Sequence, residues 1–358
     1  MSNKNRLYVD IHVLQTVPPS CVNRDDTGSP KTAVYGGVRR ARVSSQAWKR
    51  AVRLAFRDMY EPDQLSYRTK RIVRMVQKEI EILDPEKDAE KLAAEVLKSA
   101  GLSLNEKELD KGTEALFFMS TAQAKALARI AVNEPEKMQD KDACRTALIE
   151  NPSVDLALFG RMVASDPSMN YDAAAQVAHA ISTHGVQNEF DYFTAVDDLS
   201  PETTAGAGHL GTVEFNSSTL YRYATVNVSE LFNSLVDETP AAVRNFLEAF
   251  VCSMPTGKQN TFANRTLPDA VYVTVRKDQP INLVGAFEQP VMADHSSGYA
   301  ELSCKRLAEY AQKVYANYAD KPEKEWALGM LDMDAEIMPL PKLLDAVEAY
   351  LSEEISKG

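Results

Sequence analysis

The chain has 358 residues, with a formal net charge of −11 and 44% hydrophobic residues. Because this length exceeds that of a typical single hydrophobic core, we expect two domains or one domain with a large insertion. It contains no run of 18 or more apolar residues, and its start, MSNKNR, lacks the apolar core of a signal peptide, so neither a membrane span nor secretion is expected. The predicted location is the cytoplasm.

The N-terminal part predicts a strand, a long loop and a strand that leads into a helix. Residues 7–14 are rich in β-formers, whereas residues 15–37 carry several prolines and glycines. A short strand at 40–43 is followed by a helix at 44–57, which Ser44 or Ser45 can cap. In this helix Trp48 and its neighbours at helical spacing predict a buried stripe.

Residues 59–182 predict a helical insertion. Apolar side chains recur there at helical spacing, while residues 153–163 are expected to be partly extended. The helices are expected near 65–83, 87–99, 121–132, 139–149 and 172–181.

The C-terminal part returns to strands mixed with helices. We expect strands at 189–196, 212–215, 219–228 and 271–276, helices at 240–253, 299–318 and 340–354, and a flexible polar segment at 197–211. The order of elements predicts an α+β sheet domain that is interrupted by helices.

The charge is segregated along the chain. Residues 37–57 contain seven basic and no acidic side chains, whereas residues 320–358 contain ten acidic and four basic ones. Gly36 and Gly37 allow a close approach of the backbone to a ligand. The start of the 44–57 helix offers N–H groups and hydroxyls to an anion, and Lys49, Arg50 and Arg53 continue the basic surface. A phosphate-binding surface is one reading, and a solvated basic helix face is the other.

Motifs for catalysis or cofactors are weak. The GAGHLG stretch at 206–211 matches a dinucleotide-binding pattern but precedes a strand instead of opening a helix. His179 and His184 are five residues apart and would not share a helix face. Asp25-Asp26 and Asp197-Asp198 lie among loop residues that favour turns. The four cysteines form no C-x-x-C pair. We therefore predict no catalytic residue, no metal and no cofactor.

An aromatic pair, Tyr192-Phe193, lies on the strand predicted at 189–196. Neighbours on a strand point to opposite faces, so one ring can pack while the other stacks on a base or a partner. The alternative is that both rings belong to a core.

Several stretches resemble one family in order along the chain. They include YGGVRRARVSSQAWKRAVR at 35–53, AHAISTH at 178–184, DYFTAVDDL at 191–199, GHLGTVEF at 208–215 and PTGKQNTFA at 255–263. They are similar to the CasC family, the crRNA-binding backbone subunit of the type I-E CRISPR Cascade complex. The resemblance is weakest at 59–150 and after 264.

The resemblance implies a hand-shaped α+β fold. A palm similar to an RNA-recognition motif (ferredoxin-like) would comprise residues 1–58 and 217–358, helical fingers residues 59–185, and a β-hairpin thumb residues 186–216. Copies would wind along one crRNA, with the palm holding its backbone and the thumb wedging out a base. Tyr192 stands where the family pattern leads us to expect a tryptophan. The implied RNA-binding residues are Asn23, Arg24, Arg42, Ser44, Gln46, Lys49, Arg50, Arg53, Arg161, Met162, Tyr192, Phe193, Thr194, Val196, Lys258 and Gln259.

The function that the resemblance implies is non-catalytic. The protein would hold the guide for pairing with target DNA in antiviral defence, because base pairing reads the sequence while the protein reads the backbone and shape. The implied partners are crRNA, target DNA, further copies of the chain, other Cascade subunits and a recruited helicase-nuclease, with no membrane. Two rivals remain: an endoribonuclease that processes the guide, although the 44–57 helix has no histidine, and a scaffold that makes no contact with RNA.

Overall fold

The computed structural model describes residues 6–105, 108, 112–150, 152–163, 166–195, 199, 209–294 and 296–357. The chain divides into two compact units. The first, here called the sheet unit, comprises Met1–Val52, Val177–Thr225 and Phe246–Gly358, and the second, here called the helical unit, comprises Arg53–Gln176 and Val226–Asn245. The α+β class predicted from the order of elements is confirmed.

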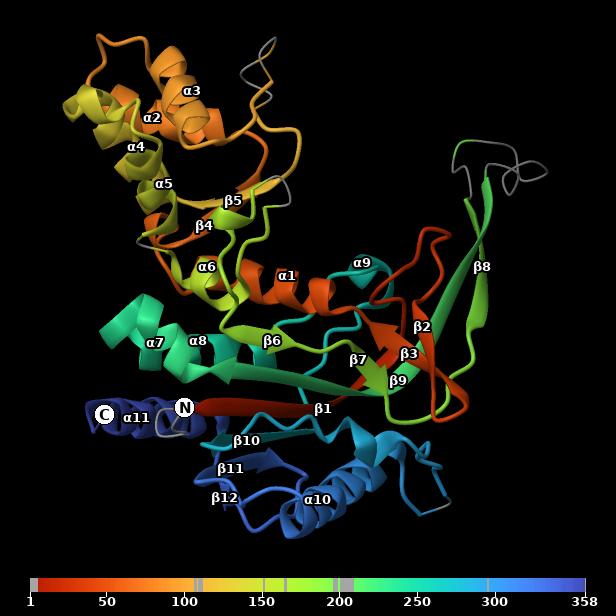
Figure 1. The fold of residues 1–358 in the computed structure, drawn as a ribbon. Helices are drawn as coiled ribbons and strands as arrows, with labels where there is room; N and C mark the ends of the chain where they lie inside the picture. The colour runs from red at the N-terminus through yellow and green to blue at the C-terminus, as the bar shows by residue number, and fades with distance from the viewer. Residues whose placement is uncertain are drawn as a thin grey trace. The chain divides into compact units, whose positions relative to one another are not determined.

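The sheet unit is built around one large mixed sheet (Figure 1). Among the described residues its strands follow the order β12-β11-β10-β1-β9-β7-β3-β2, and β8 pairs with β9 beyond this path. The strands are β1 (Tyr8–Ser20), β2 (Thr32–Tyr35), β3 (Val38–Val43), β7 (Ala180–Ser182), β8 (Glu189–Ala195), β9 (His209–Asn227), β10 (Ala270–Arg276), β11 (Lys324–Gly329) and β12 (Glu336–Ile337). The short strand β6 (Ala175–Val177) runs across the boundary between the units.

Helices cover the central strands on both faces. These are α1 (Ser45–Ala55), α8 (Thr239–Cys252), α9 (Gln259–Phe262), α10 (Tyr299–Asn317), α11 (Leu340–Ser356) and the 3₁₀ turn η7 (Leu283–Phe287). Leu307 and Ala311 of α10 share a core with Tyr272 of β10. Every residue of β10 is buried, because its neighbours β1 and β11 cover its edges and side chains cover both of its faces. This explains why β10 is a nearly continuous apolar run.

The helical unit has a hydrophobic core of its own. Its helices are α2 (Ile72–Leu83), α3 (Ala89–Ser99), α4 (Thr121–Asn133), α5 (Lys141–Ile149), α6 (Val154–Phe159) and α7 (Val228–Leu235). The unit also contains a two-stranded sheet of β4 (Ser66–Thr69) and β5 (Phe117–Ser120), and the short 3₁₀ turns η1 (Phe56–Asp58), η2 (Pro62–Gln64), η4 (Pro135–Lys137), η5 (Pro167–Met169) and η6 (Val236–Glu238). Ile72, Val76 and Ile80 follow helical spacing on α2 and are fully buried in this core.

Three expectations for the elements are wrong. Residues 172–181 form no helix but carry β6 and β7, because pairing with the sheet outweighs the helical preference of an alanine-rich stretch. The helix expected at 65–83 begins only at Ile72, and residues 66–69 form β4 instead. Residues 153–163 contain the helix α6 but are extended after it, where Arg161 forms an antiparallel bridge with Tyr171, so the expectation of a partly extended segment is met in part. The strands expected at 212–215 and 219–228 are one continuous strand, β9. The flexible segment predicted at 197–211 lies outside the described residues, apart from Leu199 and the start of β9.

Candidate nucleic-acid interface

A buried arginine holds α1 against the sheet unit. The guanidinium of Arg222 lies 3.8 Å from the ring centroid of Trp48 and 4.6 Å from that of Phe250. It donates to the Gln15 side chain over 2.6 Å and to the Phe250 carbonyl. Burial lowers the pKa of Arg222 to about 9. This contact fixes the apolar face of α1 inward, and Arg50 is the cation of the helix that is exposed.

The first amides of α1 already have acceptors within the protein. The N–H of Ser44 donates to Asn23 Oδ1 over 2.9 Å, and the N–H of Ser45 donates to His179 Nδ1 over 3.3 Å. The N–H of Ala47 donates to Ser44 Oγ over 3.3 Å, which makes Ser44 the capping residue. The anion site predicted at this helix start is therefore partly filled by Asn23 and His179.

Cations surround this helix start. Arg42 on β3 lies 3.4 Å from His179 Nδ1 and donates to the Thr32 carbonyl. Gln46 and Arg50 are exposed on α1, and Lys49 is half-buried, which lowers its pKa. The predicted residues from Arg42 to Arg50 thus occupy one end of β3 and the first two turns of α1.

The loop that carries Gly257 lies close to the loop that carries Val22 and Asn23. A Cβ atom on Gly257 would overlap the carbonyl oxygen of Val22, so only glycine allows this approach. The next residue, Lys258, adopts a left-handed conformation with φ of 50° and precedes α9. The loop that carries Lys258 and Gln259 therefore lies against the loop that carries Asn23 and Arg24, as an interface made of both would require.

We expect Gly257→Ala to weaken RNA binding, because the added methyl group must separate these two loops. Overlap with a backbone carbonyl leaves no flexible side chain to move aside. The measurement is the affinity for single-stranded RNA, together with thermal unfolding of the same sample. Gly298→Ala is the matched control, because nothing lies within 4 Å of the position of its Cβ atom and its φ is −80°. Equal RNA affinity of the two variants would contradict the prediction.

The β8–β9 hairpin carries exposed aromatic rings beside these loops. Tyr192 is 63% and Phe193 is 42% exposed, and Thr194 is exposed as well. Ser29, in the loop after Arg24, donates to Glu214 Oε1 on β9 over 2.9 Å, which ties the hairpin to that loop. Val196 lies outside the described residues. The reading that Tyr192 and Phe193 belong to a core is not supported, since both rings remain accessible.

One cation of the basic stretch at 37–57 has a structural role and is not available to RNA. Arg40 is fully buried and donates to the carbonyl groups of Tyr35, Ser182, Phe287 and Glu288. Every hydrogen bond of this guanidinium thus goes to backbone carbonyls of the sheet unit, which leaves it unsuited to bind phosphate.

Two predicted RNA-binding arginines are similarly engaged in the helical unit. Arg161 is 5% exposed and donates to the carbonyl groups of Met169, Phe118 and Leu148, and burial lowers its pKa to about 10. Arg53 lies 3.6 Å from Asp155 and 4.4 Å from the ring centroid of Phe118. Their contacts favour a structural role over a contact with RNA. By contrast, Met162 is 83% exposed in the same unit.

Two of the candidate catalytic and metal-binding groups have structural roles, while Asp197 and Asp198 lie outside the described residues. Asp25 caps a turn, because its Oδ1 accepts from the N–H groups of Thr27 and Ser29. His184 stacks on Tyr299 with ring centroids 3.7 Å apart. Within the described residues, no three His, Cys, Asp or Glu side chains gather as metal ligands. In the same part of the chain, no helix combines the length and the apolar character that crossing a membrane requires.

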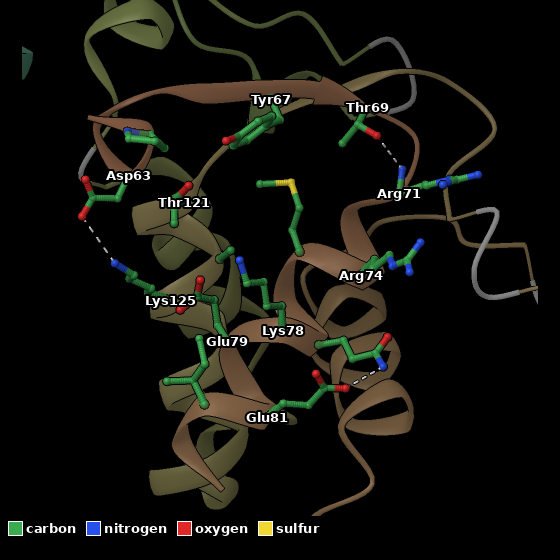
Figure 2. A pocket seen from close by; sticks show the side chains of 15 residues that line it. Asp63, Tyr67, Thr69, Arg71, Arg74, Lys78, Glu79, Glu81, Thr121 and Lys125 are labelled. Carbon is green, nitrogen blue, oxygen red and sulfur yellow. Dashed lines mark hydrogen bonds and ion pairs between the residues drawn. The ribbon is translucent and has the colours of Figure 1, made fainter. Parts of the chain in front are cut away.

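The helical unit contains a groove of about 890 Å³ between β4, α2 and α4 (Figure 2). Tyr67 reaches over it from β4, and Lys78 points into it from α2. Four basic and three acidic side chains line the groove, and Lys125 pairs with Asp63 at 3.6 Å. The balanced charge gives this groove no strong preference for a polyanion.

The structure adds two residues that the sequence did not assign to RNA binding. His179 contacts the start of α1, and Phe190, 68% exposed, lies two residues before Tyr192 on β8. Strand alternation would have grouped Phe190 with Tyr192. The contact of His179 depends on a sheet pairing that bridges more than 130 residues and has no local sequence signal.

Comparisons with known proteins agree on one family. The CT1975-like protein family matches residues 9–348. A solved chain described as "CRISPR RNA-guided surveillance complex, pre-nicking" is 34% identical, with a TM-score of 0.80 over 96% of this chain and 100% of that one. A chain described as "CRISPR RNA-guided surveillance complex" is 32% identical, with a TM-score of 0.64 over 96% of this chain and 99% of that one.

A comparison with curated proteins gives no match. The family match spans nearly the whole sequence, and the two solved chains share more than 30% of their residues with it over almost their full length. The chain therefore belongs to the CT1975-like protein family and has the fold of chains found in CRISPR RNA-guided surveillance complexes.

Proposed function

We propose that this protein is the repeated, crRNA-binding backbone subunit of a type I-E Cascade complex. The convergence of the Arg24 loop, the start of α1 and the Lys258 loop on the sheet unit carries this proposal. These three segments are far apart in sequence, yet contacts at Asn23 and Gly257 join them into one surface that carries exposed or half-buried cations. A surface of this kind can follow a phosphate backbone without reading its sequence.

In this proposal the sheet unit is the palm, similar to an RNA-recognition motif, the helical unit is the fingers, and the β8–β9 hairpin is the thumb. Copies assemble along the guide together with other Cascade subunits, target DNA pairs with the guide, and a helicase-nuclease is recruited afterwards. The protein itself performs no chemistry. The 32–34% identity to chains of CRISPR RNA-guided surveillance complexes supports this assignment.

The test is co-expression with a CRISPR transcript and the partner subunits. We expect the chain to purify with RNA of one defined length and with several protein copies per RNA. A complex with the ultraviolet spectrum of protein alone would favour the scaffold without RNA contact and contradict the proposal.

The same preparation tests the alternative that the protein is an endoribonuclease. The purified chain should leave precursor RNA intact, with and without divalent metal. Cleavage that a single substitution such as His179→Ala abolishes would identify the protein as an endoribonuclease instead. Loss of RNA binding in that variant, without any cleavage in the wild type, is compatible with the proposal, because His179 contacts α1.

A further inference from the structure

His179 reaches the start of α1 through the pairing of β3 with β7. The antiparallel register joins Val43 of β3 to Ala180 of β7. The next pair of positions in this register is Ser44 and His179. His179 therefore lies beside the first turn of α1, although 134 positions separate it from Ser45 in the sequence. All of these residues belong to the sheet unit.

The imidazole of His179 accepts from two donors at the start of α1. Its Nδ1 lies 3.3 Å from the N–H nitrogen of Ser45 and 3.4 Å from Nη1 of Arg42. A backbone amide and a guanidinium can only donate, so Nδ1 carries no proton and the neutral ring has its proton on Nε2. A phosphate at the start of α1 would bind to the same two donors. His179 thus occupies, within the protein, the place that a phosphate oxygen would take.

The charged side chains that act on His179 are two cations, Arg42 on β3 and Lys31 in the loop before β2. The backbone of Lys31 is held there, because its N–H donates to the Asn23 carbonyl over 2.8 Å and its carbonyl accepts from the Arg42 N–H over 2.9 Å. Burial of the imidazole, followed by the charges of Arg42 and Lys31, lowers the pKa of His179. The positive end of the α1 dipole acts in the same direction. A bound phosphate would oppose these effects, since its negative charge favours the protonated ring.

We propose that His179 is a positioning residue that couples RNA binding at the start of α1 to the uptake of one proton. Without RNA, the neutral ring holds the N–H of Ser45 and the guanidinium of Arg42. When a phosphate accepts from these two donors instead, Nδ1 takes a proton from the solvent, and the ring becomes a further cation beside the phosphate. This inference rests on the proposed function and assigns a pH dependence to the same surface. Because coupling between two ligands is reciprocal, a lower pH strengthens RNA binding.

The test measures the affinity of the full chain for oligouridine near pH 7.5 and near pH 5.5, a range in which histidine titrates and the bases of this RNA do not. We expect the wild type to bind about fivefold more tightly at the lower pH. His179→Asn keeps an acceptor but takes up no proton, so its affinity should match the wild type near pH 7.5 and stay unchanged near pH 5.5. Lys49→Ala is the control, which should bind more weakly at both pH values and keep the fivefold ratio. A proton NMR titration of the wild-type His179 ring needs no folded variant, and it should show that bound RNA raises the pKa of this ring.

The outcomes separate this coupling from the proposed function. A wild-type chain that binds oligouridine equally well at both pH values would overturn the coupling and leave the proposed function standing. The same conclusion follows if His179→Asn keeps the pH dependence of the wild type, because another group then takes up the proton, or if bound RNA leaves the pKa of His179 unchanged. A wild-type chain that binds no RNA at either pH would end both. A gain at low pH that only His179→Asn loses supports the coupling, since a purely structural role of His179 would not change the pH profile.

Discussion

We expect Trp48→Ala to lower the free energy of unfolding by about 3–5 kcal/mol, because a fully buried indole is removed and a cavity remains. The loss has a second part. The guanidinium of Arg222 lies between Trp48 and Phe250, and it stays buried when one of its two aromatic faces disappears. Urea unfolding followed by circular dichroism measures the effect. Since Trp48 anchors α1, the folded variant should also bind RNA more weakly.

The other tryptophan of the chain, Trp326, provides a control for the variant at Trp48. Trp326 on β11 is equally buried and packs against Tyr350 of α11, with ring centroids 6.0 Å apart. Trp326→Ala should cost similar stability but leave RNA binding unchanged below its transition. Trp48→Phe, a milder change, allows the comparison if the alanine variant does not fold. Equal loss of RNA affinity in the variants at 48 and 326 would show that α1 has no special role.

The second large effect is expected at two cations of the same helix, the half-buried Lys49 and the exposed Arg50. Replacing Lys49 and Arg50 together by alanine should reduce RNA affinity by about tenfold or more, because a hydrogen bond to a charged group is worth about 1.5–3 kcal/mol. The loss should be the same for all sequences. The slope of log affinity against log salt should fall by about 0.7 for each lost phosphate contact. Titrations of labelled RNA at several salt concentrations measure both quantities.

A control with the same change in charge separates contact from net charge. Lys305 and Lys313 are exposed on α10, which covers the other face of the sheet. Their double replacement by alanine should leave the salt slope unchanged. An unchanged slope in the Lys49 and Arg50 variant, or an equal drop in the α10 variant, would contradict a specific phosphate contact on α1.

The sequence pattern within a single helix or strand predicted the direction of its side chains. The spacing of Trp48, Ala51 and Val52 predicted the buried face of α1, and all three are buried there. The alternation of Tyr192 and Phe193 predicted opposite faces, and the register with Thr212 and Gly211 confirms it. In both cases the side-chain direction follows from the period of one element.

The role of each arginine could not be predicted in this way. Arg40 and Arg50 lie in the same basic stretch, yet Arg40 is buried because carbonyls from residues 35, 182, 287 and 288 converge on it. Such convergence depends on segments up to 248 residues apart. A sequence pattern records the charge but not the acceptors that the fold brings to it.

The strand β1 is longer than the strand predicted at 7–14. It continues to Ser20, although Pro18 and Pro19 suggested a loop from residue 15. Its register with β10 ends at Leu14, so β10 requires no N–H group from either proline.

The sheet order has a consequence for synthesis on the ribosome. β1 lies between β9 and β10, and its register joins Tyr8 to Arg276. At translation rates of roughly 5–20 residues per second, the nascent first strand waits about 10–50 s for this neighbour. Most of the helical unit emerges in the meantime and can form local contacts early. The apolar β1 is therefore the segment that nascent-chain chaperones have the longest opportunity to bind, and slow translation would extend that exposure.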